Sequence, residues 1–182
     1  MLAEAVQTIQ KQGVAALTLR GVGEQLGVSR TALYRHFENK NALLTAVALE
    51  GFRTLRRALH EAWTGGGEGR AGFEAMGAAY IRFAIDHPSH YRVMFGNALD
   101  PLTMPHPDPN GEGDAFGTLL QAVLALQKNG LARPDDARLM SMYIWSVVHG
   151  VAMLAIDGVL PEPAREPLTH YAIERIAASI AL

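Results

Sequence analysis

Apolar residues recur at helical spacing along almost the whole chain, and no segment shows the alternation of apolar and polar residues that marks a strand. Glycines, prolines and capping residues separate these segments. The pattern predicts an all-α fold. The expected helices cover approximately residues 2–12, 19–26, 30–37, 40–63, 73–86, 90–95, 114–129, 135–157 and 165–182.

Short polar motifs predict where several of these helices begin and end. Thr18 and Ser29 are typical N-terminal caps, and Gly13 and Gly27 are typical residues at a helix end. Ser89 is expected to cap the helix that follows His87-Pro88, and Pro161 and Pro163 are expected to precede the last helix.

Two segments lack a helical pattern. Residues 64–69 read TGGGEG and are expected to form a flexible joint, because glycine removes the restrictions on the backbone. Residues 100–113 contain four prolines and no apolar period, so a mobile loop is expected there.

Composition excludes several classes of protein. The chain has 182 residues, of which 49% are hydrophobic, enough for one compact body of about 130 residues and a small second domain. It has no cysteine, so disulfides, thiolate metal sites and thiol catalysis are excluded. The apolar stretch YIWSVVHGVAMLAI is judged too short and too interrupted to span a bilayer, so a soluble, cytoplasmic protein is expected.

Charge is distributed unevenly along the chain. Residues 1–57 hold eight lysines and arginines against four acidic residues, whereas the remainder holds eight against fourteen. A basic N-terminal part joined to an acidic body indicates that the N-terminal part alone binds a polyanion.

Residues 17–44 read LTLRGVGEQLGVSRTALYRHFENKNALL, in which the turn LGVS joins two short expected helices. This order is typical of a helix-turn-helix, whose second helix lies in the DNA major groove. Helical spacing points Leu33 and Phe37 inward and Thr31 and Arg35 outward.

Arginine on this outward face can form bidentate hydrogen bonds with guanine, and the methyl groups of Thr31 and Ala32 suit the thymine methyl. Neighbouring hydroxyl groups, cationic side chains and a helix end can contact phosphates. The predicted DNA-binding residues are Thr18, Arg20, Ser29, Arg30, Thr31, Ala32, Tyr34, Arg35, His36 and Lys40.

The same residues 17–44 resemble the N-terminal domain of tetracycline-repressor-type (TetR family) regulators. The match includes the Leu-Thr-x-Arg start, the Leu-Gly-Val-Ser turn, the Leu-Tyr-x-His-Phe helix and the Lys-x-x-Leu-Leu start of the next helix. The family pattern also has a longer first helix with a basic arm, and this sequence starts within that helix. The resemblance implies a three-helix DNA-binding domain at residues 1–45 and an effector-binding and dimerisation domain at residues 46–182, with a connecting helix at about residues 40–63.

A second resemblance covers most of residues 73–158. The stretch YIRFAIDHPSHYRVMFG, followed later by IWSVVHG, is similar to the effector domain of a TetR branch with a Trp-His-Gly signature, here Trp145, His149 and Gly150. Trp145 and His149 stand one helical turn apart and are expected to form one wall of a ligand pocket.

Large apolar residues with a few polar groups supply the other candidate pocket walls, although such stripes also occur in ordinary cores. A buried His149 needs a hydrogen-bond partner, either a side chain or the ligand. The predicted ligand-binding residues are Phe73, Met76, Tyr80, Phe83, Met94, Phe95, Phe116, Leu120, Val123, Met142, Trp145, Ser146 and His149.

No metal site, cofactor or catalytic site is predicted. His87 and His90, with Asp86, His106 and His149, leave a metal-responsive regulator of the same fold as an alternative, but Pro88 interrupts their spacing. Ser146, His149 and Asp157 lie on one helix, which cannot fold into a catalytic triad, so the chain is not expected to be an enzyme.

The last two expected helices are apolar on more than one face, which indicates contact with a second copy. Small residues that permit close helix contact are Ala152, Ala155, Ala172, Ala177 and Ala178. The TetR resemblance implies a homodimer through these helices. The resulting hypothesis is a transcriptional repressor released from a palindromic operator by a small, mainly apolar molecule, and the alternative class is a helical interaction module that does not bind DNA.

Overall fold

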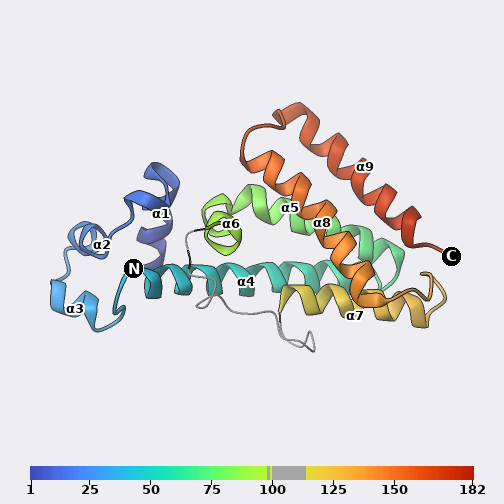
Figure 1. The fold of residues 1–182 in the computed structure, drawn as a ribbon, viewed down its shortest axis with the longest axis horizontal. Coiled ribbons are helices and arrows are strands. Elements are labelled where there is room, and N and C mark those ends of the chain that lie inside the picture. Colours follow the sequence, from blue (N-terminus) through green and yellow to red (C-terminus); the bar gives the residue numbers. More distant parts are fainter. Residues whose placement is uncertain (98, 100–113) are drawn as a thin grey trace. The chain divides into compact units, whose positions relative to one another are not determined.

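The structure, a computed structural model, describes residues 1–97, 99 and 114–182, so the expected loop at residues 100–113 lies outside the described residues. Within the described part, α-helices and one 3-10 turn are joined by short connections, without a strand, which confirms the all-α prediction (Figure 1). The elements are α1 (Leu2–Gln12), η1 (Val14–Ala16), α2 (Leu19–Leu26), α3 (Arg30–Tyr34), α4 (Lys40–Gly65), α5 (Arg70–Asp86), α6 (Pro88–Phe95), α7 (Ala115–Lys128), α8 (Ala137–Ile156) and α9 (Glu162–Ile180).

The helices form two compact units, which we call the head and the body. Among the described residues, the head contains residues 1–52, 87–97 and 99, and the body contains residues 53–86 and 114–182. Helix α4 runs from one unit into the other. The boundary between a DNA-binding domain at residues 1–45 and an effector-binding domain at residues 46–182 remains a prediction, because it concerns function and the two units are defined by packing.

The head is built around buried leucines, and its helix ends match the sequence signals. Leu17, Leu33 and Leu43 are fully buried. The Thr18 hydroxyl accepts a hydrogen bond from the Gly21 N–H at 3.0 Å, which caps α2. Gly27 ends α2 in the left-handed conformation, which glycine adopts without steric cost.

Helix α6 packs against α1 within the head and differs from expectation at its start. Its N-cap is His87, with Pro88 in the first turn, whereas Ser89 is buried inside the helix. Proline fits this position because the first N–H groups of a helix have no partner inside the helix. The predicted cap at Ser89 is therefore wrong.

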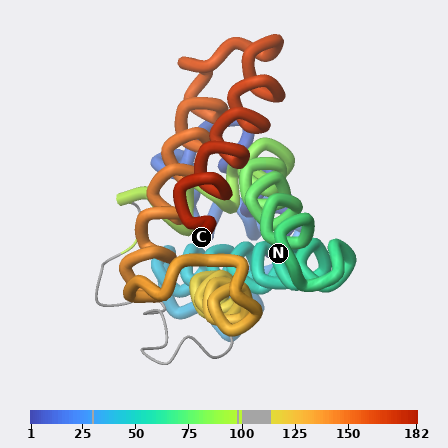
Figure 2. Tube along the Cα trace, turned by 90° about the vertical axis from the view of Figure 1, so that its right-hand side faces the viewer, coloured from blue at the N-terminus to red at the C-terminus, as the bar shows by residue number. Residues whose placement is uncertain are grey.

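In the body, α5 and α8 pack against each other and both contact α9, while α7 contacts α8. Figure 2 shows α8 and α9 side by side. Helix α9 starts at Glu162, so Pro163 lies in its first turn and Pro167 inside it. The helix therefore begins earlier than its prolines indicated, because a proline in the first turn removes no hydrogen bond of the helix.

The glycine-rich segment is a tight turn between α4 and α5 rather than a flexible joint. A Cβ atom on Gly72 would stand 2.5 Å from the Trp63 carbonyl oxygen, and one on Gly66 would overlap the Gly72 backbone. Gly67 has a φ of 81°. Glycine serves here for close approach and for a left-handed turn.

Helix α8 has the length and apolar composition of a membrane span, contrary to the expectation that this stretch is too short. Within the body it packs against α5, α7 and α9, as a core helix of a folded domain does.

Candidate nucleic-acid interface and ligand cavity

Side chains after the LGVS turn form the candidate nucleic-acid interface. Thr31, Tyr34, Arg35 and His36 are exposed, whereas Leu33 is buried. The Ser29 hydroxyl accepts a hydrogen bond from the Ala32 N–H at 3.2 Å and caps α3, as predicted. The inward position of Leu33 and the outward face are therefore confirmed, and DNA contact by these residues remains a prediction.

Helix α3 is shorter than expected. It begins at Arg30 and ends at Tyr34, and Arg35 is its C-cap. Phe37, expected to be buried, is only half-buried in the turn that follows. Arg35 and His36 therefore project from the end of the helix rather than from its middle.

Two predicted DNA-binding side chains have partners within the head. Arg20 forms an exposed ion pair with Glu24, with 2.7 Å between Nε and Oε1. The Lys40 ammonium donates hydrogen bonds to the carbonyl oxygens of Val14 at 2.9 Å and Ala15 at 3.2 Å. Lys40 thus ties the start of α4 to η1, a role that sequence spacing did not indicate.

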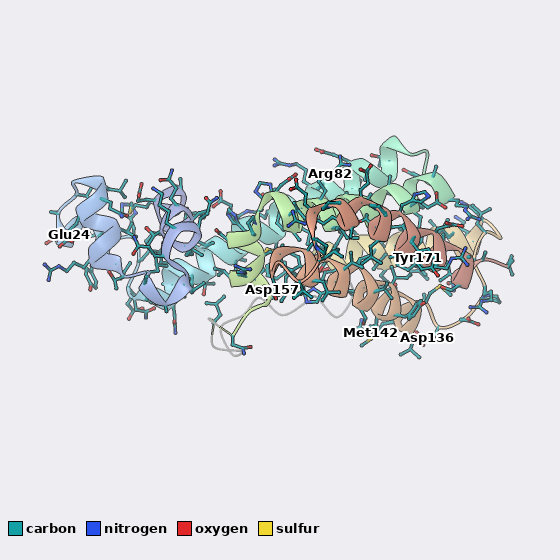
Figure 3. All side chains as sticks on the ribbon, turned by 90° about the horizontal axis from the view of Figure 1, so that it is seen from above. Glu24, Arg82, Asp136, Met142, Asp157 and Tyr171 are labelled. Atoms are coloured by element: carbon teal, nitrogen blue, oxygen red, sulfur yellow. The ribbon has the colours of Figure 1, made fainter. Side chains whose placement is uncertain are left out.

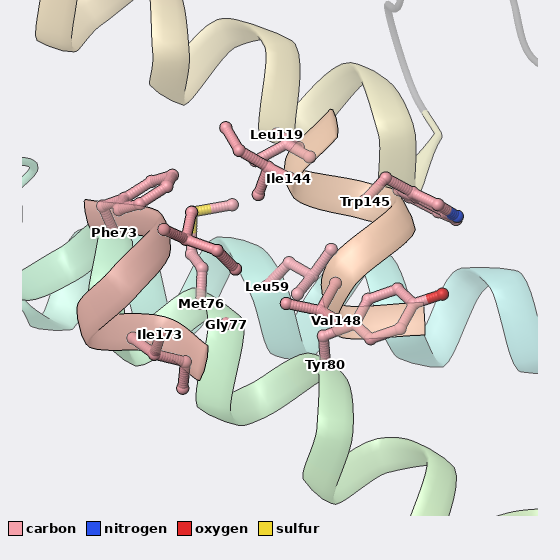
Figure 4. A pocket seen from close by; sticks show the side chains of 11 residues that line it. Leu59, Phe73, Met76, Gly77, Tyr80, Leu119, Ile144, Trp145, Val148 and Ile173 are labelled. Atoms are coloured by element: carbon pink, nitrogen blue, oxygen red, sulfur yellow. The ribbon is translucent and has the colours of Figure 1, made fainter. Parts of the chain in front are cut away.

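The body contains a cavity of about 30 Å³ among its helices. Figure 4 shows its side chains, which come from α4, α5, α7, α8 and α9. They are almost all apolar. The lining residues are Leu59, Phe73, Met76, Gly77, Tyr80, Leu119, Ile144, Trp145, Val148, Ile173 and Ile176.

A polar pair lies at one end of the cavity, where Tyr80 is a lining residue and His149 is not. The Tyr80 hydroxyl forms a hydrogen bond with His149 Nδ1 at 3.0 Å, joining α5 to α8. The ring centroids of Tyr80 and Trp145 are 5.1 Å apart and nearly perpendicular. In Figure 4 the Tyr80 oxygen and the Trp145 nitrogen point toward the same side. Burial lowers the pKa of His149, which favours its neutral imidazole.

Further aromatic and cationic groups lie next to this end. The Phe116 ring lies 5.7 Å from Trp145, and the Arg138 guanidinium lies 5.7 Å from the Phe116 centroid. These contacts link α7 to α8 beside the Tyr80–His149 pair. Among the predicted ligand residues, the structure therefore brings together Phe73, Met76, Tyr80, Phe116, Trp145 and His149.

Other predicted ligand residues do not line this cavity. Met142 is 52% exposed and points away from the body (Figure 3). Ser146 is exposed as well. Met94 and Phe95 belong to the head. Phe83, Leu120 and Val123 are not among the lining residues. The placement of Met142 and Ser146 in the pocket is therefore wrong, because this part of their helix faces outward.

Sequence reasoning missed Gly77 and six lining side chains, which are Leu59 of α4, Leu119 of α7, Ile144 and Val148 of α8, and Ile173 and Ile176 of α9. Each of the six side chains belongs to an apolar helical stripe, a signal that ordinary core residues also give. Only the packing of the helices shows that they meet at one cavity.

The described residues contain no group of three or more histidine, aspartate or glutamate side chains suited to a metal ion. His87 and His90 have ring centroids 5.9 Å apart, and His90 Nε2 lies 3.9 Å from a Glu50 oxygen. His106 lies outside the described residues. The metal-responsive alternative therefore has no ligand set in the described part of the chain.

One face of α8 exposes large apolar side chains to solvent. Leu139, Met142 and Tyr143 are 65%, 52% and 50% exposed. A side chain at Gly150 would meet no atom within 4 Å. Such an exposed apolar face on a core helix is typical of a surface that contacts another protein chain.

The small residues expected at this interface mostly serve packing within the chain. Ala152, Ala155, Ala172 and Ala177 are buried, whereas Ala178 is exposed. Alanine lets α8 and α9 approach closely. The expected close helix contact at these four alanines is therefore confirmed within the chain, and a homodimer through the last two helices remains a prediction.

Two descriptions of protein families match the chain. Residues 73–176 match the tetracyclin repressor-like C-terminal domain, and residues 1–47 match the bacterial regulatory proteins of the tetR family. Together these matches cover both units.

Individual proteins are similar as well. An uncharacterised HTH-type transcriptional regulator of Mycobacterium tuberculosis is 25% identical over 179 residues, 97% of this chain and 78% of that protein. The tetracycline repressor protein class A of Escherichia coli is 50% identical over 44 residues, 24% of this chain and 20% of that protein. A solved structure from Rhodococcus sp. RHA1, of a protein with unknown function, is 30% identical with a TM-score of 0.83, covering 100% of this chain and 93% of that one.

Proposed function

Because the chain belongs to the TetR family of bacterial transcriptional regulators, we propose that it is a repressor that leaves a palindromic operator when a small, mainly apolar molecule binds its body. The family regulates transcription through DNA binding and is not a family of enzymes. A helical interaction module without DNA binding is therefore not retained. Such a regulator acts in the cytoplasm, where the DNA is.

The observation that carries the DNA-binding part is the exposed polar surface after the LGVS turn. Arg35 and Thr31 are exposed there beside a helix whose own core side chain, Leu33, is buried. We assign base contacts to Arg30, Thr31, Ala32 and Arg35, and phosphate contacts to Thr18, Arg20, Ser29, Tyr34, His36 and Lys40.

Dimerisation follows from the limited reach of one recognition helix. A helix of this length contacts few base pairs, whereas two copies related by a two-fold axis contact half-sites about 34 Å apart on the same side of the duplex. The exposed apolar face of α8, with Leu139, Met142 and Tyr143, supports a partner at this face. Repression is supported by the similarity to an Escherichia coli protein named as a repressor.

Ligand response is supported by the apolar cavity and by the path of α4. Leu59 of α4 lines the cavity, and the same helix begins at Lys40 in the head. A ligand that moves the body end of α4 changes the DNA-competent arrangement, and a tenfold preference between the two arrangements corresponds to about 1.4 kcal/mol. Assignment to the branch with the Trp-His-Gly signature remains part of this proposal.

DNA binding is tested by selecting binding sites from a random duplex library and then titrating the selected duplex and a random duplex. The wild type is expected to enrich an inverted repeat. Replacement of Arg35 by alanine should reduce discrimination between the two duplexes by about 1–3 kcal/mol, because one base contact is lost. Equal loss of affinity on both duplexes would show that Arg35 contacts phosphate rather than bases.

A further inference from the structure

We propose that the effector is an uncharged, mainly apolar molecule with a hydroxyl group, and that this hydroxyl binds between Tyr80 and His149 in place of their direct hydrogen bond. The inference rests on the proposed ligand response and names the class of ligand. It also assigns the hydrogen bond between α5 and α8 as the contact that must open.

The size of the cavity requires that a wall moves. Its volume of about 30 Å³ has room for about two water molecules, since one water needs about 10–15 Å³ counted in this way. An effector with a ring or a short alkyl chain is several times larger. Some of the helices that line the cavity must therefore separate when such a molecule binds.

The lining residues in the described part of the chain carry no charge, and the Arg138 guanidinium lies over Phe116, which is not a lining residue. None of the eleven lining residues is aspartate, glutamate, lysine or arginine. An ion placed among these side chains would lose its hydration without gaining an opposite charge. An uncharged, mainly apolar molecule instead keeps the apolar surface of Phe73, Met76 and Ile144 away from water.

Separation of α5 from α8 at the Tyr80–His149 hydrogen bond costs the least free energy, because a ligand can replace that bond. At the apolar walls, separation loses van der Waals contacts that a ligand must restore by fitting closely. At the Tyr80–His149 contact, a polar group of the ligand can take over the hydrogen bonds of both partners. The exchange leaves neither polar side chain without a partner, so it avoids the cost of an unsatisfied buried group.

A hydroxyl is the simplest group that fits between these partners. The neutral imidazole of His149 presents either a donor or an acceptor at Nδ1, depending on its tautomer, and the Tyr80 hydroxyl both donates and accepts. A hydroxyl can donate to one partner and accept from the other in either tautomer. Trp145, in ring contact with Tyr80, would cover the inserted group.

The test compares two probes of nearly the same shape, 4-propylphenol and propylbenzene, which differ in one hydroxyl. Binding to the dimeric, DNA-free protein is measured by calorimetry for the wild type and for Tyr80→Phe, which keeps the ring. The ratio of the two affinities in each protein is the readout, because differences in the hydration of the probes cancel between proteins. The matched control is Tyr171→Phe, on an exposed tyrosine of α9.

The preference for the phenol is expected to fall about tenfold in Tyr80→Phe and to remain unchanged in Tyr171→Phe. His149→Leu should reduce the preference in the same way and serves if Tyr80→Phe does not fold, which thermal melting shows. An unchanged preference in both cavity variants, or binding of neither probe by the wild type, would overturn the proposal. Titration of the same preparations with the selected duplex shows separately whether DNA binding holds.

Discussion

Lys40 is proposed to contact a phosphate of DNA, and in the structure it binds the backbone of η1. It is the first residue of α4, where a positive charge is unfavourable for the helix dipole. Its ammonium nevertheless binds the carbonyl oxygens of Val14 and Ala15. These bonds use two of the three N–H donors of the ammonium, and the third remains for a phosphate.

Replacement of Lys40 by methionine is expected to destabilise the protein by about 1–3 kcal/mol, because two carbonyl groups lose a charged donor. Urea denaturation of the wild type and the variant measures the change. Replacement of Arg35 by alanine is the control, since this exposed side chain should alter stability by less than about 0.5 kcal/mol. Equal stability of the Lys40 variant and the wild type would show that its hydrogen bonds to η1 contribute nothing.

At the scale of the elements, capping residues and glycines define the helix ends, and one glycine also sets the packing of α4 on α5. Gly72 lies against the Trp63 carbonyl group at the start of α5. Gly65, at the end of α4, has no atom near the position of a Cβ. The two glycines belong to the same connection but differ in what surrounds them.

Gly72→Ala should destabilise the body by about 1–3 kcal/mol, because the added methyl group overlaps backbone that cannot rotate away. Gly65→Ala should be neutral or slightly stabilising, because alanine is the better helix former. Thermal unfolding of both variants checks the contrast. Similar melting temperatures for the two would mean that the close approach at Trp63 carries little energy.

Much of the fold could be predicted at this scale because caps and breaks are local signals. Thr18, Gly27 and Ser29 act as their residue types indicate. The cavity could be predicted only in part, since an apolar stripe does not show which helix it faces. Packing between segments far apart in the sequence decides that Leu59 and Ile173 line the cavity and that Met142 faces outward.

The outward face of α8 gives a prediction about assembly. Met142→Glu places a carboxylate on this apolar face and should shift the protein from dimer to monomer, because the ion would be buried without a partner. Light scattering measures the mass. Arg82→Glu adds the same side chain at an exposed position on α5, at the opposite edge of the body in Figure 3, and should stay dimeric. A dimeric Met142→Glu variant would place the interface elsewhere.

At the scale of the whole molecule, the account joins a basic head that contacts DNA to a body that pairs with a second copy. The charge follows this division only in part, because residues 1–57 carry the net positive charge but Arg53, Arg56 and Arg57 lie on the body part of α4. Two linked heads bind two half-sites more tightly than one head binds one, since the second contact becomes intramolecular.

The most direct test compares the affinity of the wild type for the selected inverted repeat with its affinity for a duplex of equal length that keeps one half-site. Fluorescence anisotropy at fixed salt measures both, since phosphate contacts make affinity depend on ionic strength. The inverted repeat is expected to bind at least about tenfold more tightly, with two chains per duplex. Equal affinity for both duplexes, or one chain on the repeat, would contradict a dimeric regulator that binds a palindrome.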